Sequence, residues 1–338
     1  MTPPSQSSPT RGYLIAFVGT AIWSTTAIFI GFLTRRYHVP PLVLAFWRDF
    51  VVAGALLAVF GLAARPRLRL ERRNVLFFVL YGFVLAAFNA LWTASIGLNG
   101  AAVATVLVYS SPAFTALVGW RLWGERLDAL KVGAVVLCIA GCALVSGAYE
   151  RAAWQVNPLS IVVGLLPGVA FAAYSLLGKA SSRRGVNPWT ATLYTFAFAA
   201  AFLLLVQRPD TLLWLSRPLA AGAGGGRDVL LGWGALVLLA VGPTIGGYGL
   251  YTVSLTMLPA ATANLIVTLE PAMTGILALL LLGERLTVLQ LAGGMAILTG
   301  VVLLRVSDRV GNAAGVSPRL QKTLMADCPA DPAKKSPP

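Results

Sequence analysis

Three ionisable residues lie inside long apolar stretches of this 338-residue chain. Arg48 and Asp49 are neighbours within the apolar run 41–63, and Glu270 directly precedes Pro271 in another run. A charged side chain at the centre of a bilayer costs at least ~2.5 kcal/mol, so such residues usually pair or mark a substrate or ion pathway. Arg48 could hold a substrate carboxylate through two hydrogen bonds, and Glu270 could meet an amine or a proton. The alternative for each is a structural ion pair or a backbone contact between helices.

Aromatic and amide side chains at similar depth form a second group of candidates for substrate binding. Rings can stack on an aromatic solute, and amides can hydrogen-bond its polar groups. Packing between helices is the alternative for each of them. The candidates are Trp23, Trp47, Asn89, Tyr109, Tyr174 and Asn264. Trp92, Trp120, Tyr248 and Tyr251 lie toward the ends of their runs, which favours anchoring at the membrane interface.

The composition of the chain indicates what positions these side chains. Hydrophobic residues make up 57% of the chain and charged residues only 11%, against roughly 25% charged in a soluble domain. The tracts 74–120 and 229–269 carry no full charge, and each is about twice the ~20 residues that one membrane helix needs. Each tract should therefore hold two spans, with breaks at Leu98-Asn99-Gly100 and Leu258-Pro259.

The remaining runs each have the length of one span, which gives ten transmembrane helices in all. Hydrocarbon offers backbone groups no water, and barrel strands would alternate polar and apolar residues, so these spans must be helices. The predicted class is an all-α integral membrane protein. Its spans are expected near 12–33, 41–63, 74–97, 101–122, 131–149, 159–180, 188–207, 229–251, 260–282 and 287–305.

A repeated phrase divides the ten spans into two halves. Gly-Glu-Arg-Leu occurs at 124–127 and again at 283–286, and Pro112 precedes the first copy at the distance at which Pro271 precedes the second. We therefore expect two five-helix repeats, 12–149 and 150–306. Because five is an odd number, the second repeat must enter the membrane inverted relative to the first. Segments 1–11 and 307–338 lack long apolar runs, and we expect a disordered amino terminus and a disordered basic tail.

The distribution of positive charge predicts the orientation. The net charge is +14, and 18 of the 26 Lys and Arg residues fall on the side that holds both termini. Seven fall on the opposite side, and Arg48 lies inside the second span. This asymmetry indicates cytoplasmic termini and needs no nucleic-acid partner.

The two halves, each with a mid-helix proline (SPAFTALVGWRLWGERL and EPAMTGILALLLLGERL) and a glycine-rich final helix, resemble the drug/metabolite transporter superfamily, EamA type. The resemblance covers about residues 12–305 and extends to the aromatic amino acid exporters of the YddG type. It implies a secondary transporter of a bacterial-type inner membrane that exports small metabolites, chiefly aromatic amino acids, by alternating access through a central cavity. It also favours a structural role for Arg48 and Glu270, because Arg in the second span and Glu-Pro in the ninth recur in relatives with different substrates.

Two symmetric pairs of residues carry further expectations. Pro112 and Pro271 each remove a backbone hydrogen bond, so they are candidate hinges, with a static kink as the alternative. Glu125 and Glu284 stand near the start of a following helix, where a carboxylate stabilises free N–H groups. A structural helix-end role is the first interpretation for this pair, and a gating salt bridge is the second.

The sequence gives little support to other classes of protein. It lacks a phosphate-binding loop, has one histidine, His38, and places Cys138 and Cys142 inside an apolar run, so we predict no enzyme, cofactor or metal. The expected partners are membrane lipid and an amino acid or related metabolite, with a proton or another coupling ion left open and a monomer as the assembly. The alternatives are an exporter of other metabolites or organic cations, or an intramembrane enzyme or scaffold.

Overall fold

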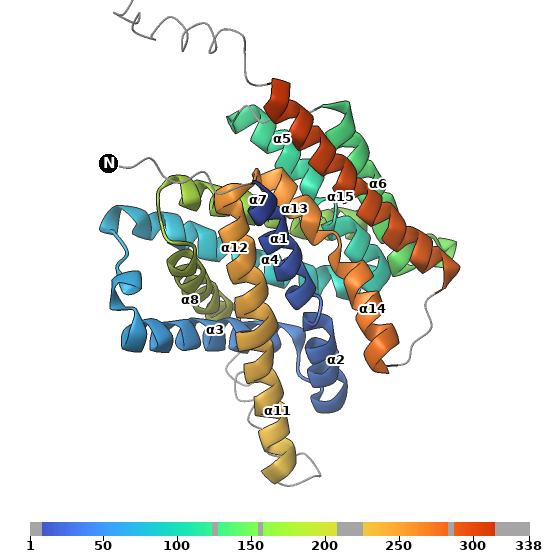
Figure 1. The fold of residues 1–338 in the computed structure, drawn as a ribbon. Helices are drawn as coiled ribbons and strands as arrows, with labels where there is room; N and C mark the ends of the chain where they lie inside the picture. The colour runs from blue at the N-terminus through green and yellow to red at the C-terminus, as the bar shows by residue number, and fades with distance from the viewer. Residues whose placement is uncertain (1–8, 124–127, 155–157, 208–225, 283–286, 315–338) are drawn as a thin grey trace, which may run out of the picture.

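The computed structural model describes residues 9–123, 128–154, 158–207, 226–282 and 287–314, and these ranges are helical without a β-strand (Figure 1). Short 3₁₀ helices lie at Arg65–Leu68 and Arg151–Trp154, and a π-helical turn lies at Ala240–Thr244. The α-helices are α1 (Pro9–Trp23), α2 (Thr26–Tyr37), α3 (Pro41–Ala63), α4 (Arg72–Val108), α5 (Ser111–Trp123), α6 (Ala129–Ser146), α7 (Pro158–Arg183), α8 (Pro188–Val206), α11 (Gly226–Leu239), α12 (Ile245–Met257), α13 (Ala260–Val267), α14 (Glu270–Leu282) and α15 (Val288–Ala314).

Ten segments of the described chain are long and apolar enough to cross a membrane, and each overlaps one predicted span. The first span joins α1 and α2, the eighth joins α11 and α12 through the π-helical turn, and the ninth joins α13 and α14. Large apolar side chains also cover the outside: Leu62 is 90% exposed and Leu205 is 80% exposed. Such a surface would be unfavourable in water but suits lipid, so the all-α membrane architecture is confirmed.

The break predicted at Leu98-Asn99-Gly100 is a bend inside a helix. Helical structure continues through these residues to Val108, so the expected non-helical turn was wrong. Side-chain atoms of Ser95 and Leu107 nevertheless both lie within 3.4 Å of the point on α7 where a Cβ on Gly164 would stand. A straight helix would separate these two residues by about 18 Å along its axis. The chain must therefore fold back between them, and the Asn99 amide joins the bend to α7 by donating to the Ser160 carbonyl at 2.8 Å.

Other predicted boundaries agree with the structure or differ from it by several residues. The break at Leu258-Pro259 is confirmed, because Leu258 is extended and α13 starts directly after Pro259. The eighth span, however, continues to Met257, beyond its expected end near residue 251. Helix also replaces the disorder expected at 9–11 and 307–314, since α1 begins at Pro9 and α15 ends at Ala314.

Helices from the two parts of the chain pack against each other in matching pairs. Glycines allow a close approach between the fifth and tenth spans, α6 and α15, which lie side by side in Figure 1. A Cβ on Gly141 would lie 2.7 Å from the Gly293 carbonyl, and a Cβ on Gly293 would lie 2.7 Å from the Gly141 carbonyl. The first span packs against the eighth through α1 and α12, just as the third packs against the sixth through α4 and α7. The centre is therefore built jointly by both parts.

Candidate functional site

Three spans are interrupted near the middle of the molecule. The first breaks at Ser24–Thr25, the fourth at Tyr109–Ser110 and the ninth at Thr268–Leu269. At the breaks, hydroxyl groups add a second bond to carbonyls that already accept the backbone N–H of the same residue: the Thr25 hydroxyl donates to the Ile22 carbonyl at 2.7 Å, and the Thr268 hydroxyl donates to the Leu265 carbonyl at 2.6 Å. Ser110 donates to Leu107 in the same way. The backbone and hydroxyl bonds together keep these polar groups paired, in a setting where an unpaired backbone group costs several kcal/mol.

Pro112 and Pro271 follow two of these breaks directly. Each is the second residue of a new helix, α5 or α14. A proline in the first turn sacrifices no hydrogen bond, because its N–H would have no partner there. The two residues therefore start helices at equivalent places in the two parts of the chain. Their predicted role as hinges stays a prediction.

The fourth and ninth breaks meet at a polar contact, which we call the Glu270 site and define as Tyr109, Ser111, Asn264 and Glu270. The Tyr109 hydroxyl donates to Glu270 Oε2 at 2.8 Å, and the Ser111 hydroxyl donates to Asn264 Oδ1 at 2.9 Å. Asn264 Nδ2 donates to Thr115 Oγ1 at 2.9 Å. No ion pair found among the described residues includes Glu270, so the Tyr109 hydroxyl is the partner that the structure gives its carboxyl group.

The first break is tied to the same region. The Thr274 hydroxyl, on α14, donates to the carbonyl of Ser24 at 3.1 Å. Helix α1 also packs against α13 and α14. The first span therefore meets the ninth here, just as the fourth meets the ninth at Glu270, and α2, α5 and α14 each begin just after one of the three breaks. A helix N-terminus presents free N–H groups and a positive dipole end, which favours a carboxylate.

Arg48, Asp49 and Asn89 form a separate unit, the Arg48 cluster, between α3 and α4. Arg48 Nη2 donates to Asn89 Oδ1 at 3.0 Å, and Arg48 Nε donates to Asp49 Oδ1 at 3.2 Å. Asn89 Nδ2 completes the ring by donating to Asp49 Oδ2 at 2.9 Å. Asp49 is fully buried and Arg48 is 8% exposed. Both charges and both ends of the amide are therefore paired within the protein.

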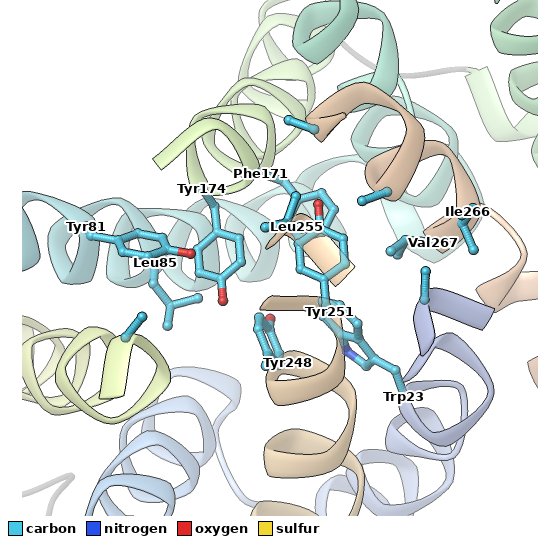
Figure 2. Packing of buried hydrophobic residues seen from close by; sticks show 14 of the residues in the cluster. Trp23, Tyr81, Leu85, Phe171, Tyr174, Tyr248, Tyr251, Leu255, Ile266 and Val267 are labelled. Carbon is cyan, nitrogen blue, oxygen red and sulfur yellow. The ribbon is translucent and has the colours of Figure 1, made fainter. Parts of the chain in front are cut away.

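Aromatic side chains form a third unit, the central aromatic cluster of Trp23, Phe171, Tyr174, Tyr248 and Tyr251 (Figure 2). The ring centroids of Trp23 and Tyr248 lie 4.1 Å apart, and those of Trp23 and Phe171 lie 5.9 Å apart. Ser175 links this cluster to the Glu270 site, because its hydroxyl lies 2.6 Å from the Tyr251 hydroxyl and accepts from Asn264 Nδ2 at 3.1 Å.

The interfacial positions predicted for Tyr248 and Tyr251 were wrong. Both rings are 2% exposed and belong to the central aromatic cluster. The error follows from the short boundary expected for the eighth span, since its extension to Met257 moves both residues away from the helix end. Trp120 is 51% exposed on the outer surface, as an interfacial or lipid-facing residue would be.

The structure distributes the substrate-binding candidates predicted from the sequence over three locations. Trp23, Tyr109, Tyr174, Asn264 and Glu270 lie in the two linked units at the centre, and Arg48 and Asn89 lie in their own cluster. Trp47 lies apart, on α3 against Trp233 of α11, with centroids 5.6 Å apart. Glu125 and Glu284 lie outside the described residues.

Several central residues were missed by the sequence reasoning. Ser111, Thr115 and Ser175 connect Asn264 to its neighbours, yet they are small hydroxyl residues that commonly bond their own helix. Ser111 and Thr115 stand one helical turn apart in an apolar run, and this spacing was the available signal. Among the described residues, no group of three or more His, Cys, Asp or Glu side chains could hold a metal ion.

Ten apolar spans with interrupted helices that meet at a buried polar centre define a multi-pass membrane protein built like a secondary transporter. Comparison with known proteins identifies the family. The EamA-like transporter family matches residues 10–147 and again residues 158–306, and the chain therefore belongs to that family. The family comprises transporters rather than enzymes, which implies a small-molecule substrate and a lipid environment.

Curated relatives carry transporter names. An uncharacterized transporter of Archaeoglobus fulgidus is 28% identical over 65% of this chain and 74% of its own length. The uncharacterized transporter YwfM of Bacillus subtilis is 23% identical over 93% of this chain and 96% of its own. The threonine/homoserine exporter RhtA of Salmonella typhimurium is 27% identical over 69% of this chain and 72% of its own.

A solved structure supports the fold independently. One crystal structure superposes with a TM-score of 0.69 at 19% identity, covering 89% of this chain and 99% of that one. At this level of identity the likeness concerns the fold alone. The family assignment therefore rests on the sequence match, and the arrangement of the helices agrees with a known structure.

Proposed function

We propose that this protein exports amino acids, aromatic ones above all, by alternating access between two inverted five-helix repeats. The proposal rests on the meeting of two interrupted spans beside the central aromatic cluster, where the Tyr109 hydroxyl lies 2.8 Å from Glu270 Oε2. Interrupted helices at the middle of the membrane commonly supply the substrate site of secondary transporters.

An amino acid needs partners for three different groups. Its carboxylate suits the helix N-termini at Thr26, Ser111 and Glu270, which begin at the breaks. Its ammonium group suits the carboxyl group of Glu270, which has no basic partner among the described residues. Its side chain suits the rings of Trp23 and Tyr248 if that side chain is aromatic. Leaving any of these charges unpaired in a dry site would be expensive, so the combination favours a zwitterion with a ring.

The symmetry of the breaks supports alternating access. Ten spans in two matching sets of five run in opposite directions through the membrane, since five is odd. The fourth and ninth breaks occupy equivalent positions, each just ahead of Pro112 or Pro271. Bending at one break would open one side, and bending at its counterpart would open the other. The charge asymmetry supports an inner-membrane location with both termini in the cytoplasm.

A smaller, hydroxyl-bearing amino acid is the second candidate substrate. The relative RhtA is named a threonine/homoserine exporter, and it is 27% identical to this chain over 235 residues. The hydroxyl groups of Ser111, Thr115 and Ser175 around Asn264 could hydrogen-bond such a side chain. The central aromatic cluster favours an aromatic side chain. The two candidate substrates would therefore place their side chains differently, one against the rings and the other against the hydroxyl groups around Asn264.

Counterflow with purified protein in liposomes tests both candidates. Vesicles are loaded with phenylalanine, threonine, alanine or tetraethylammonium, and uptake of the same labelled compound is followed. We expect saturable exchange of phenylalanine that exceeds exchange of alanine. Exchange of threonine without phenylalanine would select the second candidate. Exchange of the organic cation alone, or of none of the compounds, would reject amino acid export.

A further inference from the structure

A basic cavity of about 340 Å³ lies away from the central site, at the ends of four spans. Its walls come from the connection between the second and third spans and from the turn between the sixth and seventh. The charged and amide side chains that line it are Arg67, Arg69, Glu71, Asn74, Arg184 and Asn187. A second cavity of similar volume adjoins it and shares Asn74 and Arg184. The walls therefore combine segments from both five-helix parts of the chain.

Contacts between these segments fix the shape of the cavity. The Thr190 hydroxyl donates to the carbonyl of Arg67 at 2.9 Å. The Arg184 guanidinium lies over the Phe77 ring, 4.0 Å from its centroid. Gly185 turns the chain with φ of +72°, a conformation that L side chains rarely adopt. Asn187 then caps α8 by accepting from the Trp189 N–H at 3.0 Å. These contacts fix the backbone segments that carry the arginines.

The charge of the cavity is strongly positive. Glu71 is the acidic residue in its lining, and it is already paired with Arg73. The other ion pairs among the described residues are Arg36 with Asp228 and Arg48 with Asp49. Among the described residues, no ion pair therefore includes the three arginines that line the cavity, Arg67, Arg69 and Arg184. Helices α4 and α8 also begin beside the cavity, at Arg72 and Pro188, and their positive dipole ends add to its field.

We propose that this cavity binds a phosphate group, carried by an anionic phospholipid headgroup or free in solution. Guanidinium groups bind phosphate through paired hydrogen bonds, and helix N-termini favour the same anion. The ends of membrane spans lie at headgroup depth, where basic pockets between helices recognise anionic lipids. Because Arg67 and Arg69 belong to the first part of the chain and Arg184 to the second, an occupant ties the two parts together at this end.

Thermal unfolding of the full-length protein in detergent tests the proposal. The probes are dioctanoyl phosphatidylglycerol, dioctanoyl phosphatidylcholine and inorganic phosphate, each titrated over a wide range. The variants are R67Q/R69Q and R184Q. The matched control is R65Q/R72Q, which removes the same charge from the same segment at residues that do not line the cavity.

A saturable rise in melting temperature with phosphatidylglycerol is the expected result, and phosphatidylcholine should give none. The apparent affinity should fall at least about tenfold in R67Q/R69Q and in R184Q, because each change removes charged hydrogen bonds. The control should bind like the unaltered protein. If inorganic phosphate reproduces the full response with the same sensitivity to the variants, the occupant is soluble phosphate. Equal responses to charged and neutral lipid, or equal losses in R67Q/R69Q and the control, would overturn the site.

Discussion

Two buried polar units of this transporter differ in how completely they are paired. In the Arg48 cluster, the guanidinium, the carboxylate and both ends of the Asn89 amide bond one another within 3.2 Å. In the Glu270 site, the carboxyl group has a tyrosine hydroxyl as its partner, and no ion pair among the described residues reaches it. A closed ion pair leaves little for a ligand to bind, whereas an unbalanced carboxyl group can still take a cation or a proton. We therefore propose that the first unit holds α3 against α4 and that the second binds substrate.

The largest effect should come from opening the Arg48 cluster. Asp49→Leu leaves the Arg48 charge buried without its partner, so we expect a loss of about 3–5 kcal/mol in the free energy of unfolding. Denaturant unfolding in detergent measures this loss. The double variant Arg48→Met with Asp49→Leu removes both charges and should recover most of it. Equal stability of Asp49→Leu and the unaltered protein would mean that the cluster does not hold the helices together.

Pro112→Ala and Pro271→Ala should have an intermediate effect, on transport more than on folding. Each proline stands in the first turn of its helix, so alanine fits without strain and should change stability by no more than about 1 kcal/mol. Alanine allows the preceding helix to continue through the break, which should slow transport severalfold by opposing the bend. Counterflow rates at equal protein amounts measure this. Unchanged rates in both variants would assign the prolines to packing.

The smallest effect should be on selectivity. Trp23→Ala removes a ring from the central aromatic cluster, and we expect the KM for phenylalanine to rise a few-fold relative to that for alanine. Tyr109→Phe instead removes the hydroxyl that bonds Glu270, so it should affect both amino acids alike. Paired transport measurements with the two substrates distinguish these outcomes. A parallel change for both substrates in Trp23→Ala would exclude this ring as a source of selectivity.

The spans, the duplication and most candidate residues could be predicted from the sequence, because apolar length and repetition are local properties. The place of the bend at Asn99 was predicted from its turn residues, but its helical form was not. The break at Ser24–Thr25 was missed, because a hydroxyl bond stands there without turn residues. The central positions of Tyr248 and Tyr251 were missed because hydropathy does not mark where a helix ends. Hydrogen-bond partners that are distant in sequence could not be predicted either. A single sequence does not show that Asn89 bonds Arg48 or that Tyr109 bonds Glu270.

Binding of phenylalanine to the Glu270→Gln variant measures whether the carboxylate of Glu270 holds the ammonium group of the substrate. Glutamine keeps the size of the side chain and can still accept from the Tyr109 hydroxyl, but it cannot carry a negative charge to meet an ammonium group. Labelled phenylalanine is titrated onto purified protein, and the melting temperature is recorded on the same samples. We expect at least about tenfold weaker binding with an unchanged melting temperature, since a charged hydrogen bond to the ligand is lost. Unchanged binding, or a loss of binding that appears only together with a lowered melting temperature, would contradict it.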